Sequence, residues 1–315
     1  MNRIALAMSL AAGAFMVAAP AFSQNENEGR GQAVVTVLPA KDSAPAPTLS
    51  QQDLALKVNG KDTAITNFTP LRGENNRLEL VVLIDSSAHG SIGTQLPDIA
   101  NFVKSLPAEA KVSIAWMVNG TAQLATPLTS DHQAALKGIR LPSGIPGMSA
   151  SPYFCLQNLA QHWPSSDRGA RRVVVMITDG IDYYNPRYDP EDPYMQAAIR
   201  DSVKSGLVVY SIYWRNQGRY DRSMYGTDAG QNLMLQVTDA TGGYSYWQGY
   251  GNPVSLQPYF KDLDRRLQNQ YEVAFTTPLK GKSGDVSNMK LKVNGSPAKI
   301  DAPQQVYVTR ATSGM

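Results

Sequence analysis

Residues 78–87 read LELVVLIDSS, and this stretch decides the fold. Its first seven residues form a continuous apolar run, which is typical of a strand buried on both faces of a sheet. Similar runs follow at 172–178 (RVVVMIT), the strongest in the chain, and at 207–213 (LVVYSIY). Amphipathic segments with helical spacing separate them. Buried strands that alternate with helices predict an α/β fold, with a doubly wound, mostly parallel sheet flanked by helices.

The remaining elements of this sheet follow from the same patterns. Asn119-Gly120 lies between two apolar runs and predicts a hairpin, so 121–126 is expected as a short antiparallel edge strand beside 111–118. Two more strands are predicted at 244–247 and 271–276. The predicted helices span 92–106, 130–139, 153–163, 194–205, 231–241 and 256–270.

Two β hairpins are predicted outside the sheet, at 51–77 and, with a tail, at 278–315. Both turn at Asn-Gly, and they share the string Lys-Val-Asn-Gly at 57–60 and 292–295. Because the two ends of a domain often lie close together, we expect the hairpins to pair as a small β appendage. The alternative is a chance similarity of two turns, since Asn-Gly is favoured in any tight hairpin.

The N-terminal residues have the layout of a secretory signal peptide at 1–23. Arg3 precedes an apolar run at 4–19, and a small-x-small cleavage site ends at Ser23. The run is shorter than the ~20 residues of a membrane-spanning helix, and no later stretch is long and apolar enough to span a bilayer. We therefore expect export to the periplasm or the medium, with a polar and Pro/Ala-rich linker at 24–50.

Composition excludes some functions. The net charge of +3 is small, and no run of Lys and Arg could follow a phosphate backbone, so nucleic-acid binding is disfavoured. Cys155 is the one cysteine, so an internal disulfide is impossible and a hydrophobic core must stabilise the fold. Its apolar neighbours predict that Cys155 is buried.

Carboxylates and hydroxyls follow two of the buried strands. Asp85 and Ser87 come after the first strand, and Thr178 and Asp179 end the strongest one. Ligands of a doubly wound sheet bind outside the carboxyl ends of its strands. Carboxylate and hydroxyl oxygens suit a hard divalent cation, so these strand ends form a candidate metal site.

The chain resembles the von Willebrand factor type A family over residues 78–277. VVLIDSS at 81–87 is similar to the opening strand and metal-ion-dependent adhesion motif, Asp-x-Ser-x-Ser, of that family. MITDG at 176–180 resembles its distal aspartate motif, and TDATGG at 238–243 resembles a late helix end in its bacterial members. The resemblance implies a domain that binds a protein partner, often through Mg²⁺ or a similar cation completed by an acidic residue of the partner.

Two positions depart from the family's motif. His89 stands where the second serine belongs, and imidazole suits zinc or copper better than magnesium. The loop at 146–152 (PGMSASP) has no threonine, and either Ser149 or Ser151 could offer that hydroxyl in its place. Either a cation binds here, or the carboxylates bond to loop backbone as Asp does in turns. The candidate cation ligands are Asp85, Ser87, Asp179, Ser149 and Ser151.

Two loops at the same edge are rich in Tyr and Arg, which supply much of the energy at protein interfaces. They span 183–194 (YYNPRYDPEDPY) and 215–227 (RNQGRYDRSMYGT), and the neighbouring Asp182 is interpreted as a surface carboxylate. The alternative is ordinary loops whose tyrosines pack back on the body. The candidate partner-binding residues are Tyr183, Tyr184, Arg187, Tyr188, Arg219, Tyr220, Arg222 and Tyr225.

Catalytic motifs are absent from the sequence. The three histidines lack the spacing of a metalloprotease, and no nucleophile elbow or phosphate-binding loop occurs. Asp85, Ser87 and His89 lie too close in one loop for the geometry of a catalytic triad. We expect an exported, non-catalytic protein-binding domain; the alternatives are a metal-independent assembly module of the cell envelope and, third, a hydrolase. The sequence indicates neither the partner's identity nor the oligomeric state.

Overall fold

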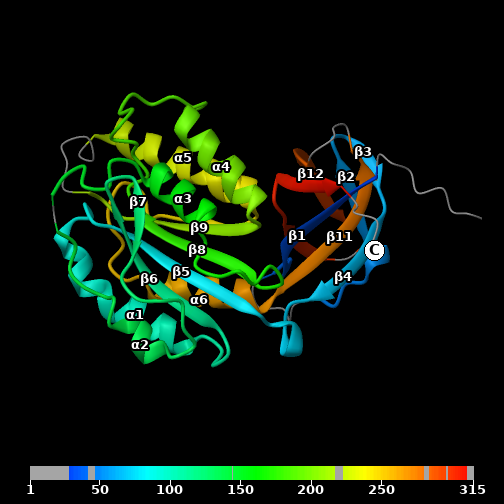
Figure 1. The fold of residues 1–315 in the computed structure, drawn as a ribbon, viewed down its shortest axis with the longest axis horizontal. Coiled ribbons are helices and arrows are strands. Elements are labelled where there is room, and N and C mark those ends of the chain that lie inside the picture. Colours follow the sequence, from blue (N-terminus) through cyan, green and yellow to red (C-terminus); the bar gives the residue numbers. More distant parts are fainter. Residues whose placement is uncertain are drawn as a thin grey trace, which may run out of the picture.

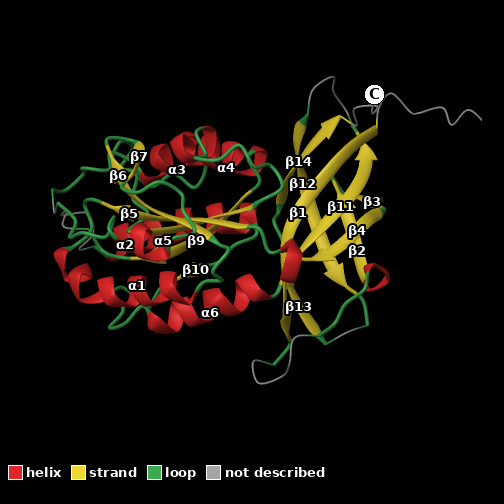
Figure 2. Ribbon diagram, turned by 60° about the horizontal axis from the view of Figure 1, so that its bottom comes forward, coloured by secondary structure: helices red, strands yellow, loops and turns green. Residues whose placement is uncertain are grey.

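The structure is a computed structural model that describes residues 28–41, 47–143, 145–216, 223–279, 284–295 and 297–310. The predicted signal peptide at 1–23 lies outside these ranges. Two sheets lie side by side, one covered by helices and one built of antiparallel strands (Figure 1, Figure 2). Within the described ranges, no helix has both the length and the apolar character needed to cross a membrane.

The helix-covered sheet has six strands in the order β10-β9-β8-β5-β6-β7. Every neighbouring pair is parallel except β6 with β7, so the predicted antiparallel edge strand is confirmed. The chain winds outward from β5 in one direction and then returns to wind outward from β8 in the other. This order confirms the doubly wound α/β class and places its switch point between β5 and β8. The strands are β5 (Leu78–Asp85), β6 (Lys111–Val118), β7 (Thr121–Leu124), β8 (Arg171–Thr178), β9 (Leu207–Tyr213) and β10 (Ser245–Tyr246).

Helices cover both faces of this sheet, as Figure 1 shows. Alternate residues of β5 enter two separate cores: Leu80 packs with the helices of one face and Val81 with those of the other. One face carries α1 (Leu96–Ser105), α2 (His132–Leu136) and α6 (Gln257–Gln268). The other carries α3 (Pro152–Gln161), α4 (Pro193–Lys204) and α5 (Met224–Thr241). Three short 3₁₀ helices are η1 (Gln51–Asp53), η2 (Gly73–Asn75) and η3 (Gly90–Gln95).

The second sheet is antiparallel throughout, in the order β3-β2-β12-β14-β1-β11-β4, with β13 paired to β1. Ala64 alone separates β3 from β4, which lie at opposite ends of this order. The sheet therefore curls round on itself and encloses its own apolar core. Its strands are β1 (Glu28–Pro39), β2 (Leu54–Val58), β3 (Lys61–Thr63), β4 (Ile65–Pro70), β11 (Gln270–Pro278), β12 (Asp285–Val293), β13 (Ala298–Asp301) and β14 (Gln305–Arg310).

The two flanking segments do pair, and their predicted proximity is confirmed. β2 and β3 form the hairpin expected at Asn59-Gly60. β2 also pairs with β12, with Lys57 opposite Lys290, so the strands that carry the two Lys-Val-Asn-Gly strings are neighbours. The turn at 294–295 differs from expectation: β12 pairs with β2 and β14, whereas β13, which follows the turn, pairs with β1. The result is a full second sheet and not a small appendage.

Two strands of this sheet correct the predicted domain bounds. β1 lies within 24–50, where a linker was expected. The sequence did not predict this strand because glycines stand at two of its buried positions and hide the alternation of apolar and polar residues. Gly31 occupies a buried position where the ring of Phe275 fills the space, and a Cβ there would lie 2.3 Å from that ring. β11, expected as the last strand of the doubly wound sheet, instead pairs with β1 and β4. Its local pattern makes it a strand but does not choose its sheet.

The second sheet attaches at the amino-terminal ends of the parallel strands. The chain passes from β4 into β5 and leaves α6 directly into β11. The carboxyl ends of β5, β8 and β9 therefore face away from the second sheet (Figure 1). The edge where the candidate residues lie is left uncovered by that sheet.

Candidate functional site

Asp85 ends β5 at the switch point of the sheet and is only 1% exposed. Its Oδ1 accepts a hydrogen bond from the backbone N–H of Ser87 (2.7 Å). Its Oδ2 accepts from the hydroxyls of Thr178 (2.9 Å) and Ser149 (3.4 Å). Burial raises the pKa of Asp85, and these hydrogen bonds oppose that rise without cancelling it. Both oxygens are therefore already bonded within the protein.

The loop before α3 lies over this strand end. The backbone N–H of Ser149 donates to the hydroxyl oxygen of Ser87 (3.2 Å), and the hydroxyl of Ser143 donates to the carbonyl of Ser86 (2.9 Å). Of the two serines left open by the sequence, Ser149 thus reaches Asp85. Ser151 instead accepts from the backbone of Tyr153 and caps α3.

Asp179 follows β8 at the neighbouring strand end and is buried. Its Oδ1 accepts from the backbone N–H of Ile181 (3.0 Å), and its Oδ2 accepts from the hydroxyl of Tyr183 (2.8 Å). These bonds, among others, tie the carboxylate to its own loop. Tyr183, a candidate partner-binding residue, is half-buried and uses its hydroxyl in this contact.

His89 is exposed and does not join the buried group around Asp85. Its Nδ1 lies 2.9 Å from the hydroxyl of Ser91. Its backbone N–H donates to the carbonyl of Arg215 (2.8 Å), and its carbonyl accepts from the indole of Trp214 (3.2 Å). The residue in the place of the motif's second serine is thus held against the end of β9.

The residues at the strand ends meet only part of what a cation site shared with a partner requires. The donors that Asp85, Ser87, Ser149 and Asp179 offer are all oxygen, which fits Mg²⁺ or Mn²⁺. All four are buried, and the hydrogen bonds already described use both oxygens of Asp85. The donor chemistry therefore fits a divalent cation, whereas the burial of these four residues does not fit a site that a partner's carboxylate completes.

Asp182 is buried, which corrects its interpretation as a surface carboxylate. Its Oδ1 accepts from the backbone N–H groups of Tyr184 (2.8 Å) and Asn185 (3.3 Å). Asp192, also buried, caps α4 and accepts from the amide of Asn185 (2.8 Å). Burial raises the pKa of Asp182. The two carboxylates fix the shape of the loop between them.

Exposed apolar side chains gather at this same edge. The described residues include eleven exposed large apolar side chains, and eight of them lie in the loops or first helical turn at the carboxyl edge of the sheet. We call these eight the rim. They are Leu141, Ile145, Tyr184, Met224, Tyr225, Trp247, Tyr250 and Val254.

The predicted partner-binding residues fall partly on the rim. Tyr184 is 66% exposed and packs edge-on against Phe154, with ring centroids 5.4 Å apart. Arg187 is exposed, and the half-buried Tyr188 packs edge-on against Tyr225 on the first turn of α5 (6.3 Å). The other three lie outside the described residues: Arg219, Tyr220 and Arg222.

The sequence reading missed two parts of the rim. One is the loop after β10, which carries Trp247, Tyr250 and Val254, and the other is the loop before α3, which carries Leu141 and Ile145. The stretch at 247–254 (WQGYGNPV) combines aromatic residues with Gly, Asn and Pro directly after a predicted strand. That combination was the signal that could have identified the first of these loops.

No protein-family model matches the chain, and no curated protein matches it either. Solved structures are similar to it at low identity. An aerotolerance-related membrane protein from Bacteroides fragilis is 18% identical, with 60% of this chain and 98% of that chain covered and a TM-score of 0.43. A von Willebrand factor type A protein from Catenulispora acidiphila is 11% identical, covering 90% and 74%, with a TM-score of 0.42. The manganese-loaded TRAP protein of Plasmodium vivax is 12% identical, covering 72% and 93%, with a TM-score of 0.40.

The fold is von Willebrand factor type A-like. In the strand order of the sheet, β5 lies next to β8, so the two motif segments are side by side. Asp85 is the last residue of β5, and Asp179 directly follows β8.

Proposed function

We propose that this chain is an exported, non-catalytic protein-binding module whose contact surface is the rim. The observation that carries the proposal is the gathering of exposed Tyr, Trp and aliphatic side chains at one edge of the sheet. Exposed apolar side chains that gather on one part of a surface commonly mark an interaction site, and Tyr and Trp are enriched among the residues that dominate binding energy. The predicted signal peptide supports the assignment outside the cytoplasm.

Two aromatic residues of the rim, Tyr184 and Tyr225, are held by contacts with other aromatic rings. Tyr184 contacts Phe154 and Tyr194, with ring centroids 5.4 and 5.5 Å apart, and Tyr225 contacts Tyr188. Side chains that are already ordered lose less conformational entropy on binding. The rim is thus suited to bind as a preformed surface.

A metal-independent mode of binding fits the strand ends better than a cation bridge. Asp85 and Ser87 are buried beneath the loop before α3, so rim side chains lie outermost. A second candidate uses the same surface with a divalent cation at Asp85, and the all-oxygen donor set around that carboxylate favours it.

Partner capture from a native envelope extract tests the proposal. We expect wild-type protein to retain a discrete partner, and Tyr184→Ala or Tyr225→Ala to weaken that binding by about tenfold or more, as truncated interface anchors do. Leu235→Ala is the matched control, because Leu235 is exposed on α5 but lies three turns beyond the rim. Equal capture by all variants would exclude the rim as the contact surface.

Calorimetric titration with Mg²⁺, Mn²⁺ and Zn²⁺ separates the two candidates. Our proposal expects no binding heat, no change in melting temperature and partner capture that survives a chelator. Saturable Mn²⁺ binding by the wild type, lost in Asp85→Asn and Asp179→Ala, would establish the cation-dependent mode instead. Turnover of an ester or peptide panel that disappears in Ser87→Ala would contradict the non-catalytic assignment.

A further inference from the structure

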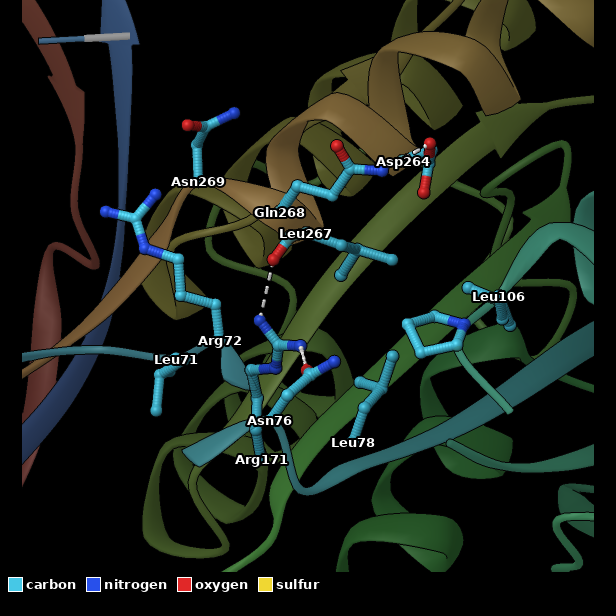
Figure 3. Close-up of a pocket in the computed structure, with 11 residues that line it drawn as sticks. Leu71, Arg72, Asn76, Leu78, Leu106, Arg171, Asp264, Leu267, Gln268 and Asn269 are labelled. Atoms are coloured by element: carbon cyan, nitrogen blue, oxygen red, sulfur yellow. Dashed lines mark hydrogen bonds between the residues drawn. The ribbon is translucent and has the colours of Figure 1, made fainter. Parts of the chain in front are cut away.

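A cavity of about 320 Å³ lies at the opposite edge of the six-stranded sheet, where the second sheet attaches (Figure 3). This volume is at the lower end of the range for small-molecule sites, roughly 300–1,000 Å³. The connection from β4 to β5, the first residues of β5 and β8, and the end of α6 all line it. Leucines supply its apolar wall: Leu71, Leu78, Leu106 and Leu267.

Arg171 lines this cavity and is a buried cation, 6% exposed. Its Nη1 donates to the carbonyl of Leu267 (2.8 Å) and to Oε1 of Gln270 (2.6 Å), and its Nη2 donates to Oδ1 of Asn76 (2.8 Å). All three acceptors are uncharged, and none of the described carboxylates forms an ion pair with Arg171. Its Nε is buried and has no hydrogen-bond partner among the described groups.

This arrangement is costly for a guanidinium. Buried charges are normally paired with an opposite charge, and the end of α6 offers Arg171 only the partial negative charge of a helix carboxyl terminus. Burial lowers the pKa of Arg171 to about 10. An anion in the cavity would supply the missing opposite charge.

Arg72 is the second arginine that lines this cavity. It is exposed, its Nη2 donates to the hydroxyl of Tyr271 (2.8 Å), and it lies 5.4 Å from the centre of that ring. The one carboxylate in the lining, Asp264, accepts from Gln268 (2.8 Å) and lies on the side of the view away from Arg72 in Figure 3. The cavity thus has a cationic end and an apolar wall.

We infer that this cavity binds a small organic monocarboxylate, with its carboxylate at Arg171 and Arg72 and its apolar body against the leucines. The planar guanidinium matches the two oxygens of a carboxylate. A multiply charged phosphate fits less well, because it would have to share the cavity with Asp264 and the apolar wall. The site is independent of the rim, which lies at the other edge of the sheet.

Thermal unfolding and calorimetric titration with hexanoate and benzoate test this inference. Each carboxylate should bind saturably and raise the melting temperature by roughly 3 °C at about ten times its dissociation constant. Hexanamide and benzamide have the same shape without the charge, and they should have no effect. Inorganic phosphate should bind more weakly than either carboxylate.

Variants of the two arginines locate the binding. Arg72→Gln should abolish the shift without harming the fold, because Arg72 is exposed. Arg171→Lys keeps a charge but loses the planar fork, so it should weaken binding at least tenfold. Arg77→Gln is the matched control, since Arg77 lies in the same connection but pairs with Asp167 outside the cavity lining. The inference is overturned if no carboxylate binds, if the amides bind equally, if phosphate binds more tightly, or if Arg72→Gln binds like the wild type.

Discussion

Gly230 on α5 shows how closely single residues determine the position of the strand-end carboxylates. A Cβ at this position would lie 1.9 Å from the carbonyl oxygen of Asp179. Gly180, which directly follows Asp179, has φ +71°, a left-handed conformation that favours glycine. The two glycines let α5 pack directly on the turn that presents Asp179. Backbone contact at this point leaves no room for even a methyl group.

Gly230→Ala should therefore lower the free energy of unfolding by about 1–3 kcal/mol, the typical cost of overpacking a filled core. Urea denaturation followed by circular dichroism measures the change. Gly251→Ala is the control, because a Cβ there meets nothing within 4 Å, and it should stay within about 0.5 kcal/mol of wild type. A stable Gly230→Ala protein would show that the turn can shift without cost.

At the scale of elements, α6 connects the two sheets through Arg266. This side chain is 4% exposed, and it donates to Asp262 one turn earlier (2.7 Å) and to Asp301 on β13 (2.7 Å). Its guanidinium also lies 4.0 Å from the ring centre of Tyr244. A buried cation with two carboxylates contrasts with Arg171, which has none among the described residues.

Asp262→Asn should destabilise the protein by about 1–2 kcal/mol at pH 7. This is less than the loss of a fully buried ion pair would cost, because solvent screens the partly exposed Asp262. Burial raises the pKa of Asp262, but hydrogen bonds from Arg266 and Arg265 outweigh it and hold the pKa below its ordinary 3.8. A depressed pKa means that the carboxylate stabilises the fold above its unfolded-state pKa and loses that effect as the pH falls through the folded-state pKa. The difference between wild type and Asp262→Asn should thus shrink below about pH 4.

Denaturation at pH 7, 5 and 3 measures this dependence. Asp264→Asn on the same helix is the control, because burial raises the pKa of Asp264 and its charge opposes folding at neutral pH. That variant should show no loss at pH 7. A constant difference for Asp262→Asn across the pH range would contradict the role assigned to its charge.

For the whole molecule, the helix-covered sheet is an insertion between two paired strands. β4 and β11 are neighbours in the second sheet, with Pro70 opposite Tyr271, so residues 71–270 leave and return at adjacent points. The insertion has apolar cores on both faces of its own sheet. The second sheet draws β1 and β14 from the two ends of the described chain.

A fragment spanning 71–270 should consequently fold on its own and unfold cooperatively, at a lower melting temperature because the contacts with the second sheet are lost. Deletion of 28–39 in the full chain should instead disrupt the second sheet, since β1 joins β11 to β14. Circular dichroism, thermal unfolding and binding of an apolar dye measure both outcomes. A fragment without a cooperative transition would mean that the two sheets fold only together.

The sequence by itself determined the elements whose signal is local. The runs at 78–84 and 172–178 are apolar except at Glu79, Arg172 and Thr178, because both faces of a central parallel strand are buried. Asn119-Gly120 predicts the antiparallel edge because a tight hairpin turn favours those residues. Asp85 and Asp179 could be predicted to lie at strand ends because they stand at the ends of these apolar runs. These features depend on neighbours within a few residues.

Only the tertiary structure decided what depends on distant partners. β1 is a strand because it pairs with β11, β13 and β14, and the ring of Phe275 fills the space beside Gly31. β11 joins the second sheet because β1 and β4 lie on either side of it. The hydrogen bond from Ser149 to Asp85 joins residues 64 positions apart in the chain. The groups around Arg171, which include no carboxylate paired with it among the described residues, also come from distant segments. Strand register, burial of charge and enclosure of a cavity are properties of packing, which no short stretch of sequence contains.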